Sequence, residues 1–263
     1  MPAELSRFIV RVLRVPATMW ATTRLWMRAG MADVPLDSSR AMTPAELLGA
    51  LNETEQRHAP PTLYVTGRLD VIDGGPRVAI VGSRRPTREG LEAAAGLARD
   101  LCAQRVVIVS GLAAGIDTAA HRASITAGGR TIGVLGTPLE KAYPAANAEL
   151  QRHMAREQLL VSQFAPGTRT RPEHFALRNR TMALIADASI IVEAGESSGT
   201  QHHGWEMIRL GRPVYFHPGL ASATGLKWPR EMLRYGARVL NSLGDLLDEL
   251  PPVGRISSVH APF

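Results

Sequence analysis

The chain has 263 residues, enough for one large α/β domain with a short extension but not for three domains of ordinary size. Hydrophobic residues make up 45% and charged residues 21%, a composition that argues against both a disordered tail and a membrane protein. The single cysteine, Cys102, excludes an internal disulfide and a zinc finger. A reducing compartment, the cytoplasm, is therefore expected.

The formal charge is +6, and all but two of the 30 basic residues are arginine. The positive charge is not spread evenly. Residues 61–180 hold 16 basic and 10 acidic side chains, whereas residues 181–250 hold 6 and 8. The excess on the middle of the chain favours a polyanionic partner, either nucleic acid or nucleotide.

Residues 1–60 are predicted to form a short helical extension. Arg7, Arg11 and Arg14 lie on one face of an amphipathic segment that Pro16 interrupts, so a surface helix packed on the main domain is expected. The apolar run is far shorter than the ~20 residues of a membrane span, and no membrane role is expected.

A second helix is predicted over residues 43–57. Thr43 is placed as its N-cap, with Pro44 at the first helical position and Glu46 three residues after the cap. Residues 58–61 are then expected to form a hinge to the main domain.

From residue 63 onward, short apolar runs alternate with helical segments. Six runs are rich in Val and Ile and lack polar alternation: Val78–Val81, Val106–Val109, Thr131–Leu135, Leu159–Ser162, Ser189–Glu193 and Val214–His217. Such runs are typical of a parallel sheet covered on both faces. Helical stretches such as Gly90–Gln104 and Ala145–Arg156 separate them. The sequence therefore predicts an α/β fold over residues 61–250, an extended Rossmann-like, doubly wound, mostly parallel sheet, with a tail at 251–263.

A sheet of this kind binds ligands at the carboxyl ends of its strands. After the first run, Gly82 permits a tight turn, the Ser83 hydroxyl can donate to an anion, and the guanidinium groups of Arg84 and Arg85 can bind phosphate oxygens. An ordinary turn with solvated arginines is the alternative.

Small residues also follow the second run. Ser110, Gly111 and Gly115 permit close approach of a ligand, and Asp117 is placed to cap the helix that carries His121. A lone histidine on a helix is more often packed against the core than used as a base, so packing is the expected role of His121.

An aromatic residue with two arginines makes a third cluster. Phe175 precedes Arg178, Asn179 and Arg180, a set that suits one stacked base and its neighbouring phosphates. A salt-bridged helix with Phe175 in the core is the alternative.

The fourth cluster joins a strand end to a helix N-terminus. Ser198, Gly199 and Thr200 offer backbone N–H groups to an anion there. His202 and His203 follow, but adjacent helical residues point about 100° apart and cannot share one metal ion as an i, i+4 pair does. No metal site and no cofactor are expected.

Taken in chain order, these four clusters and the segments around them resemble the DNA-processing protein A family, also called DprA or Smf. The matching positions are Leu63–Tyr64, Gly67, Ala79–Arg84, Val109–Ala113, Gly115–Asp117, Ala120–His121, Val134–Gly136, Tyr143–Pro144, Phe175, Arg178–Arg180, Val192–Ala194, Ser198–Thr200, Gly211–Arg212 and Pro218–Gly219. The resemblance covers about 155 residues of the main domain, from Leu63 to Gly219.

The resemblance implies an extended Rossmann-like fold, single-stranded DNA bound in a basic pocket, a homodimer, and loading of a RecA-type recombinase in recombination or natural transformation. It implies no enzymatic activity. By position, it places Arg84 in a Gly-Ser-Arg motif and Arg178 and Arg180 in an Arg-Asn-Arg motif. A basic residue that commonly precedes the aromatic is not at its expected place, and Arg171 is the nearby substitute.

The sequence departs from the family pattern at two further places. Gln163 stands where a glutamate is usual, and residues 202–204 replace apolar and Thr-Ala positions. Two other functions therefore stay open. A nucleotide hydrolase of the phosphoribohydrolase type needs a glutamate nearer to Thr200 than Glu206 is. A nucleotide-sensing module would bind a small phosphorylated ligand in the same crevice without turnover.

A leucine stripe ends the main domain. Leu240, Leu243, Leu247 and Leu250 recur at helical spacing within Val239–Leu250. Such a stripe either contributes to a dimer face or packs on the core of its own chain.

Overall fold

The computed structural model describes residues 39–196 and 198–252. All of them belong to the second of two units into which the chain divides, Pro35–Phe263. The amphipathic segment predicted around Arg7 to Pro16 and most of the tail at 251–263 lie outside the described residues.

The described residues form one nine-stranded sheet in the order β1-β2-β6-β5-β4-β3-β7-β8-β9. The strands are β1 Arg40–Met42, β2 Leu63–Gly67, β3 Arg77–Val81, β4 Val107–Ser110, β5 Thr131–Leu135, β6 Leu159–Ser162, β7 Ala188–Ile191, β8 Val214–Phe216 and β9 Arg238–Val239. All neighbours from β6 to β9 pair in parallel, while β2 runs antiparallel to β6 and β1 antiparallel to β2. The predicted α/β fold with a mostly parallel sheet is confirmed.

The order of the strands places the ligand crevice. From β3 the chain adds β4, β5 and β6 on one side, and it then returns to add β7 on the other side of β3. This reversal between β3 and β7 is the topological switch point, outside which open α/β sheets bind their ligands.

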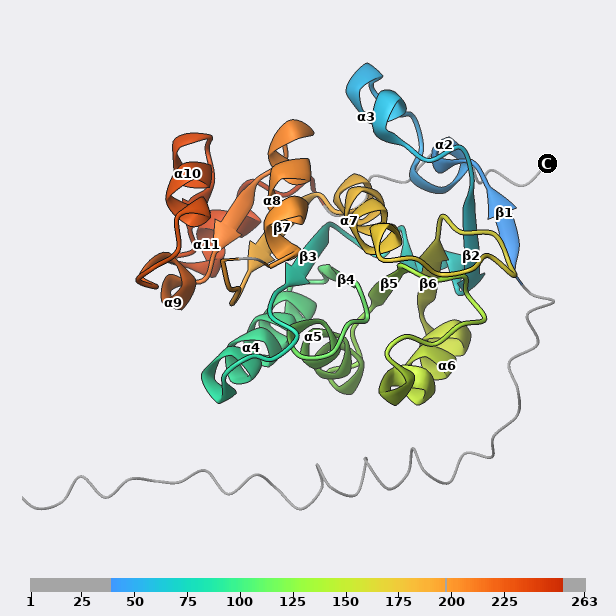
Figure 1. Ribbon diagram of the computed structural model, residues 1–263, viewed down its shortest axis with the longest axis horizontal. Coiled ribbons are helices and arrows are strands. Elements are labelled where there is room, and N and C mark those ends of the chain that lie inside the picture. Colours follow the sequence, from blue (N-terminus) through green and yellow to red (C-terminus); the bar gives the residue numbers. More distant parts are fainter. Residues whose placement is uncertain (1–38, 197, 253–263) are drawn as a thin grey trace, which may run out of the picture. The chain divides into compact units, whose positions relative to one another are not determined.

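Helices cover both faces of the sheet. Figure 1 shows α4, α5 and α6 on one side and α7 and α8 on the other. The α-helices are α2 Pro44–Leu48, α3 Glu53–His58, α4 Arg88–Ala103, α5 Ile116–Thr126, α6 Ala148–Glu157, α7 Glu173–Ile185, α8 Thr200–Arg209, α9 Pro218–Ala221, α10 Trp228–Arg234 and α11 Leu243–Leu247. Among the described residues, no helix is long and apolar enough to cross a membrane.

The side chains of β3 alternate between two cores, as the pleat of a strand requires. Val78 and Ile80 pack in the core that includes Leu101 of α4, while Ala79 and Val81 pack in the core on the side of α7. All four are at most 4% exposed, which explains why this strand shows no polar alternation.

The single helix predicted over 43–57 is wrong, because the segment forms two helices, α2 and α3. The predicted capping box at Thr43 is confirmed: its Oγ1 accepts from the Glu46 N–H at 3.2 Å, and the Glu46 carboxylate accepts from the Thr43 N–H at 2.6 Å. Gly49, with φ of +83°, then ends α2, and Asn52 begins α3 with a second capping box. The two capping boxes, at Thr43 and Asn52, each begin a helix, so the segment forms two helices and not one.

The leucine stripe packs on the chain's own core. Leu240 and Leu246 are buried, and Leu243, Leu247 and Leu250 pack against the same core as α4 and α5. The stripe is not one helix, because β9 and α11 share it. It therefore gives no support to a dimer face.

We expect opposite effects from alanine at two glycines. Gly96 lies inside α4, where the nearest atom to an added Cβ is Arg99 Nη2 at 3.9 Å, so Gly96→Ala should raise the free energy of unfolding by about 0.5–1 kcal/mol. Gly67 has φ of +102°, and its Cβ would fall 2.1 Å from the Gln158 carbonyl oxygen. Gly67→Ala should therefore lower the free energy of unfolding by about 1 kcal/mol or more. Urea denaturation measures both, and effects of the same sign would contradict this account.

Candidate nucleic-acid interface

A cleft of about 640 Å³ opens at the switch point between β3 and β7. All four predicted clusters contribute residues to its lining, the second of them through Asp117. Of the predicted site residues, those that line it are Gly82, Ser83, Arg84, Phe175, Arg178, Asn179, Ser198, Gly199 and Thr200. Segments that lie more than a hundred residues apart in the sequence thus meet in one concave surface.

A smaller hollow of about 100 Å³ adjoins the cleft. Gly111 and Tyr143 contribute to it, and Arg84, Phe175 and Arg178 line both hollows. These three side chains therefore lie at the boundary between the two.

The loops after β3 and β7 are hydrogen-bonded to each other. The Ser83 N–H donates to the Glu193 carbonyl at 2.6 Å, and the Thr87 N–H and hydroxyl donate to the Glu193 carboxylate at 3.1 and 2.6 Å. The Thr200 hydroxyl donates to the Gly82 carbonyl at 3.3 Å. This cross-bonding holds the two loops in one conformation before any ligand binds.

The loop after β4 is shaped by buried polar groups. The Asp117 carboxylate accepts from the N–H groups of Gly111 and Ala113, at 3.1 and 3.3 Å. Burial raises the pKa of Asp117, while Arg178 and these N–H donors act to lower it. Asp117 is not the N-cap of α5; Gly115 holds that position, and Asp117 lies in the first turn and bonds back to the loop.

Ser110 and Gly115 lie outside the cleft lining. The Ser110 hydroxyl is fully buried and donates to the Ile80 carbonyl at 2.6 Å. Gly115 packs so closely on the loop after β3 that an added Cβ would fall 2.3 Å from the Ser83 carbonyl oxygen. Both residues shape the loops beside the cleft.

The exposed side chain of Arg84 and the half-buried ring of Phe175 form a pair at the cleft. The Arg84 guanidinium carbon lies 5.4 Å from the centre of the Phe175 ring, within the range of a cation–π contact. The Tyr143 ring lies on Phe175 at 5.1 Å between centroids, and Tyr143 is itself exposed. The result is a charged and aromatic surface of the kind that binds phosphates and stacks bases.

Arg178 lies at the floor of the cleft, only 5% exposed. Its Nη1 donates to the carbonyls of Val134, at 3.1 Å, and Gly111. No described residue hydrogen-bonds its Nε. Burial lowers the pKa of Arg178, and Asp117 opposes that shift. The guanidinium fits because residue 111 is glycine: an added Cβ there would fall 1.5 Å from Arg178 Nη1.

Two buried histidines support the site from below. His203 Nδ1 donates to the Asn179 carbonyl at 3.3 Å, and its Nε2 accepts from the Ser189 hydroxyl at 3.0 Å. His121 donates to the Thr131 hydroxyl oxygen at 2.7 Å. Burial lowers the pKa of His203 to about 4 and that of His121 to about 3. Both are neutral packing residues, as expected for His121.

The structure does not bring Arg171 and Arg180 into the cleft lining. Arg171 is exposed and lies 3.9 Å from the Glu173 carboxylate. Arg180 lies 3.8 Å from the Glu206 carboxylate on α8. Arg180 comes two residues after Arg178 on α7, about 200° around the helix axis, so it lies on nearly the opposite face from the cleft. Arg171 precedes the helix.

Arg85, predicted with Arg84 as a guanidinium of the first cluster, also lines the cleft. The sequence does not mark His202 or Tyr143 as binding residues, although His202 lines the cleft and Tyr143 lines the smaller hollow. Tyr143 had a signal, because it lies in a segment that matches the family, whereas His202 had only its place next to the fourth cluster. Among the described residues, no group of three His, Cys, Asp or Glu side chains could hold a metal ion.

Fold and cleft together define a Rossmann-like α/β protein with a basic site at its switch point. A family model described as DNA recombination-mediator protein A matches residues 45–251. The chain belongs to this family, and the resemblance seen in the sequence is confirmed.

The curated relatives are DNA-processing proteins. DprA of Bacillus subtilis is 35% identical over 192 residues, covering 73% of this chain and 65% of that protein. DprA of Streptococcus pneumoniae is 37% identical over 191 residues, covering 73% and 67%. A putative DprA of Mycobacterium tuberculosis is 34% identical over 201 residues, covering 76% and 52%. The chain thus spans about half to two thirds of the length of these relatives.

Solved structures agree with the family assignment. The X-ray structure of DprA from Streptococcus pneumoniae aligns with a TM-score of 0.69 at 32% identity, over 82% of this chain and 76% of that one. DNA processing protein A from Helicobacter pylori, whose structure concerns its single-stranded DNA binding mode, aligns with a TM-score of 0.67 at 26% identity, over 80% and 94%.

The buried histidines predict a loss of stability in acid. As the pH falls below about 6.5, the unfolded chain protonates His203 while the folded protein does not, down to about pH 4. Unfolding thus takes up a proton, and the free energy of unfolding should fall by about 1.4 kcal/mol per pH unit for this histidine.

Urea denaturation between pH 7 and pH 5 measures that slope, and His203→Gln should reduce it by this amount. Asp117, whose pKa shifts the other way, is common to both proteins and cancels from the difference. An unchanged slope in the variant would show that His203 is not the titrating group.

Proposed function

We propose that the protein binds single-stranded DNA without acting on it as an enzyme, and that it mediates DNA recombination in this way. One observation carries the proposal: Arg84 lies over the Phe175 ring at a preorganised cleft, with Arg178 at its floor. Guanidinium groups bind backbone phosphates of any sequence, and an aromatic ring stacks any base. The structure of the Helicobacter pylori relative supports the same ligand.

The carboxylates near the cleft support binding over catalysis. Asp117 is the sole acid among the described lining residues, and it is buried beneath two N–H donors. Glu193 is bonded to Thr87, and Glu206 lies 3.8 Å from Arg180. A hydrolase needs a carboxylate that can reach its substrate as a base or nucleophile, and these acids are engaged in other contacts.

The family assignment supports the remaining parts of the proposal. We infer that the protein works in the cytoplasm as a homodimer and delivers bound single strands to a RecA-type recombinase, in recombination or natural transformation. The name of the matching family model, a recombination mediator, supports that role.

Binding to a labelled oligonucleotide at physiological salt tests the proposed ligand. We expect the single strand to bind more tightly than a duplex of the same length, with little dependence on sequence, because no predicted contact reads a base edge. Equal or tighter binding to the duplex would contradict the proposal. Thermal stabilisation by a mononucleotide, without any oligonucleotide binding, would instead favour the nucleotide-sensing alternative.

Replacing Arg84 should weaken binding to every sequence. A phosphate contact to single-stranded DNA contributes about 0.7 to the slope of log affinity against log salt, so Arg84→Ala should reduce the slope by about that amount. The expected loss of binding free energy is about 1–3 kcal/mol. Arg99→Ala, an exposed residue of α4 outside the cleft lining, is the control and should leave both unchanged. A normally folded Arg84→Ala variant with the parent's affinity and slope would place the DNA site elsewhere.

A further inference from the structure

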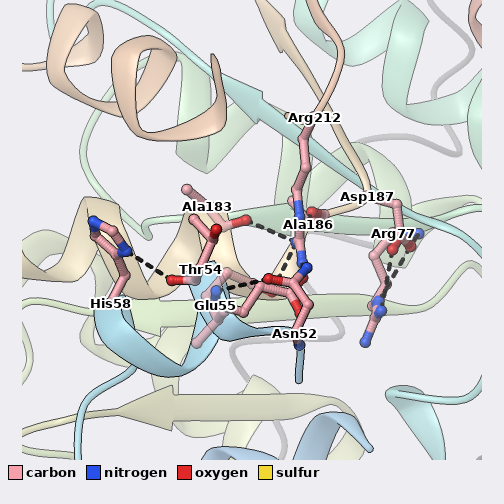
Figure 2. A network of polar contacts seen from close by, with 10 residues as sticks. Asn52, Thr54, Glu55, His58, Arg77, Ala183, Ala186, Asp187 and Arg212 are labelled. Atoms are coloured by element: carbon pink, nitrogen blue, oxygen red, sulfur yellow. Dashed lines mark hydrogen bonds and ion pairs between the residues drawn. The ribbon is translucent and has the colours of Figure 1, made fainter. Parts of the chain in front are cut away.

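Arg212 lies just after α8, and it caps the C-terminal end of α7, which is the end of that helix away from the cleft. Its Nη1 donates to the carbonyls of Ala183 and Leu184 at 2.8 and 2.7 Å, and also to that of Ala186 (Figure 2). The last carbonyls of a helix have no partner within the helix, and here one guanidinium satisfies three of them. The C-terminal end of α7 is thereby fixed.

Glu55 on α3 holds that guanidinium in place. One carboxylate oxygen accepts from Arg212 Nη2, and the other accepts from the Asn52 N–H at 2.9 Å, closing the capping box that begins α3 (Figure 2). The side chains of Glu55 and Arg212 are 14% and 15% exposed. Replacing either residue alone would leave the other as an unpaired charge with little access to water, so each side chain needs the other.

The same residue also closes the end of α8. The Arg212 N–H donates to the Met207 carbonyl at 2.9 Å. Helix α7 carries Phe175 and Arg178 near its start, and α8 begins at Thr200, all three in the cleft lining. Arg212 therefore joins the far ends of the two helices whose near ends form the binding surface.

We propose that Glu55 and Arg212 are positioning residues for the DNA cleft. They fix α7 along its axis against α8, so a short helix outside the cleft sets the spacing of Phe175 and Arg178 from the α8 N-terminus. This inference rests on the proposed function, because single-stranded DNA is the ligand whose affinity the spacing controls.

The salt dependence of DNA binding distinguishes a residue that positions the cleft from one that contacts a phosphate. Glu55→Gln should weaken binding of the labelled single strand about three- to tenfold at every salt concentration, because a residue that acts on the ligand only through its neighbours has a modest effect on affinity. The slope against salt should stay that of the parent, since neither residue touches a phosphate. Arg84→Ala, by contrast, lowers the slope.

Matched variants control for stability. Arg77→Gln removes a comparable ion pair, Arg77 with Asp187 at 3.1 Å and 19% and 18% exposed, which joins the starts of β3 and β7 (Figure 2). It should lower the melting temperature but leave affinity unchanged. Glu53→Gln on the exposed side of α3 should change neither. The double variant Arg212→Lys, Glu55→Gln should lose less binding free energy than the sum of the losses in the two single variants, because both substitutions disrupt the same ion pair.

Three results would overturn the proposal. Unchanged affinity in Glu55→Gln, together with a loss of stability like that of Arg77→Gln, would make the pair structural only. A lower salt slope in Glu55→Gln would show that Arg212 contacts DNA directly. Hydrogen exchange, which needs no DNA, gives the third: if Glu55→Gln does not speed exchange in the last turn of α7, the link is absent. Failure of the parent protein to bind DNA would instead refute the proposed function.

Discussion

The proposed binding surface depends on the junction at Glu193. Neighbouring parallel strands end at the same edge of a sheet, so the loops that leave β3 and β7 must pass each other within a few ångströms. Each loop carries backbone N–H groups that need acceptors once they are shielded from water. The main-chain and side-chain oxygens of Glu193 supply those acceptors to Ser83 and Thr87. Because this junction is formed within the protein, the cleft does not have to be organised by its ligand.

Three arginines of this fold have different roles because their surroundings differ. Arg84 is exposed beside an aromatic ring, which leaves its donors open to solvent. Arg178 is buried, and its Nη1 donates to two carbonyls. The floor of the cleft is therefore both positively charged and rigid. Arg212 donates to carbonyls at the C-terminal end of α7 and forms an ion pair with the Glu55 carboxylate. The guanidinium suits all three roles because its donors point in fixed directions within one plane.

The sequence predicts the central sheet well because burial leaves a direct mark on composition. The run Thr131–Leu135, for example, is buried at all five positions and coincides with β5. Strand β1, Arg40–Met42, leaves no such mark, because it is short and largely exposed at the edge of the sheet. The burial of Arg178 could not be predicted either, since it depends on the absence of a side chain at Gly111, 67 residues away in sequence. Nor does any local pattern connect Glu55 with Arg212, 157 residues apart.

The lengths of the outermost strands bear on how copies of this protein can meet. Among the described residues, the sheet ends in β1, of three residues, and β9, of two. Unpaired backbone groups on an outer strand are a template onto which a foreign strand can add, and each further residue lengthens the template. Strands this short offer only a few such groups, so continuous sheets built across several molecules are disfavoured. Any association between copies must then rely on side chains, whose chemistry is specific to the surfaces that meet.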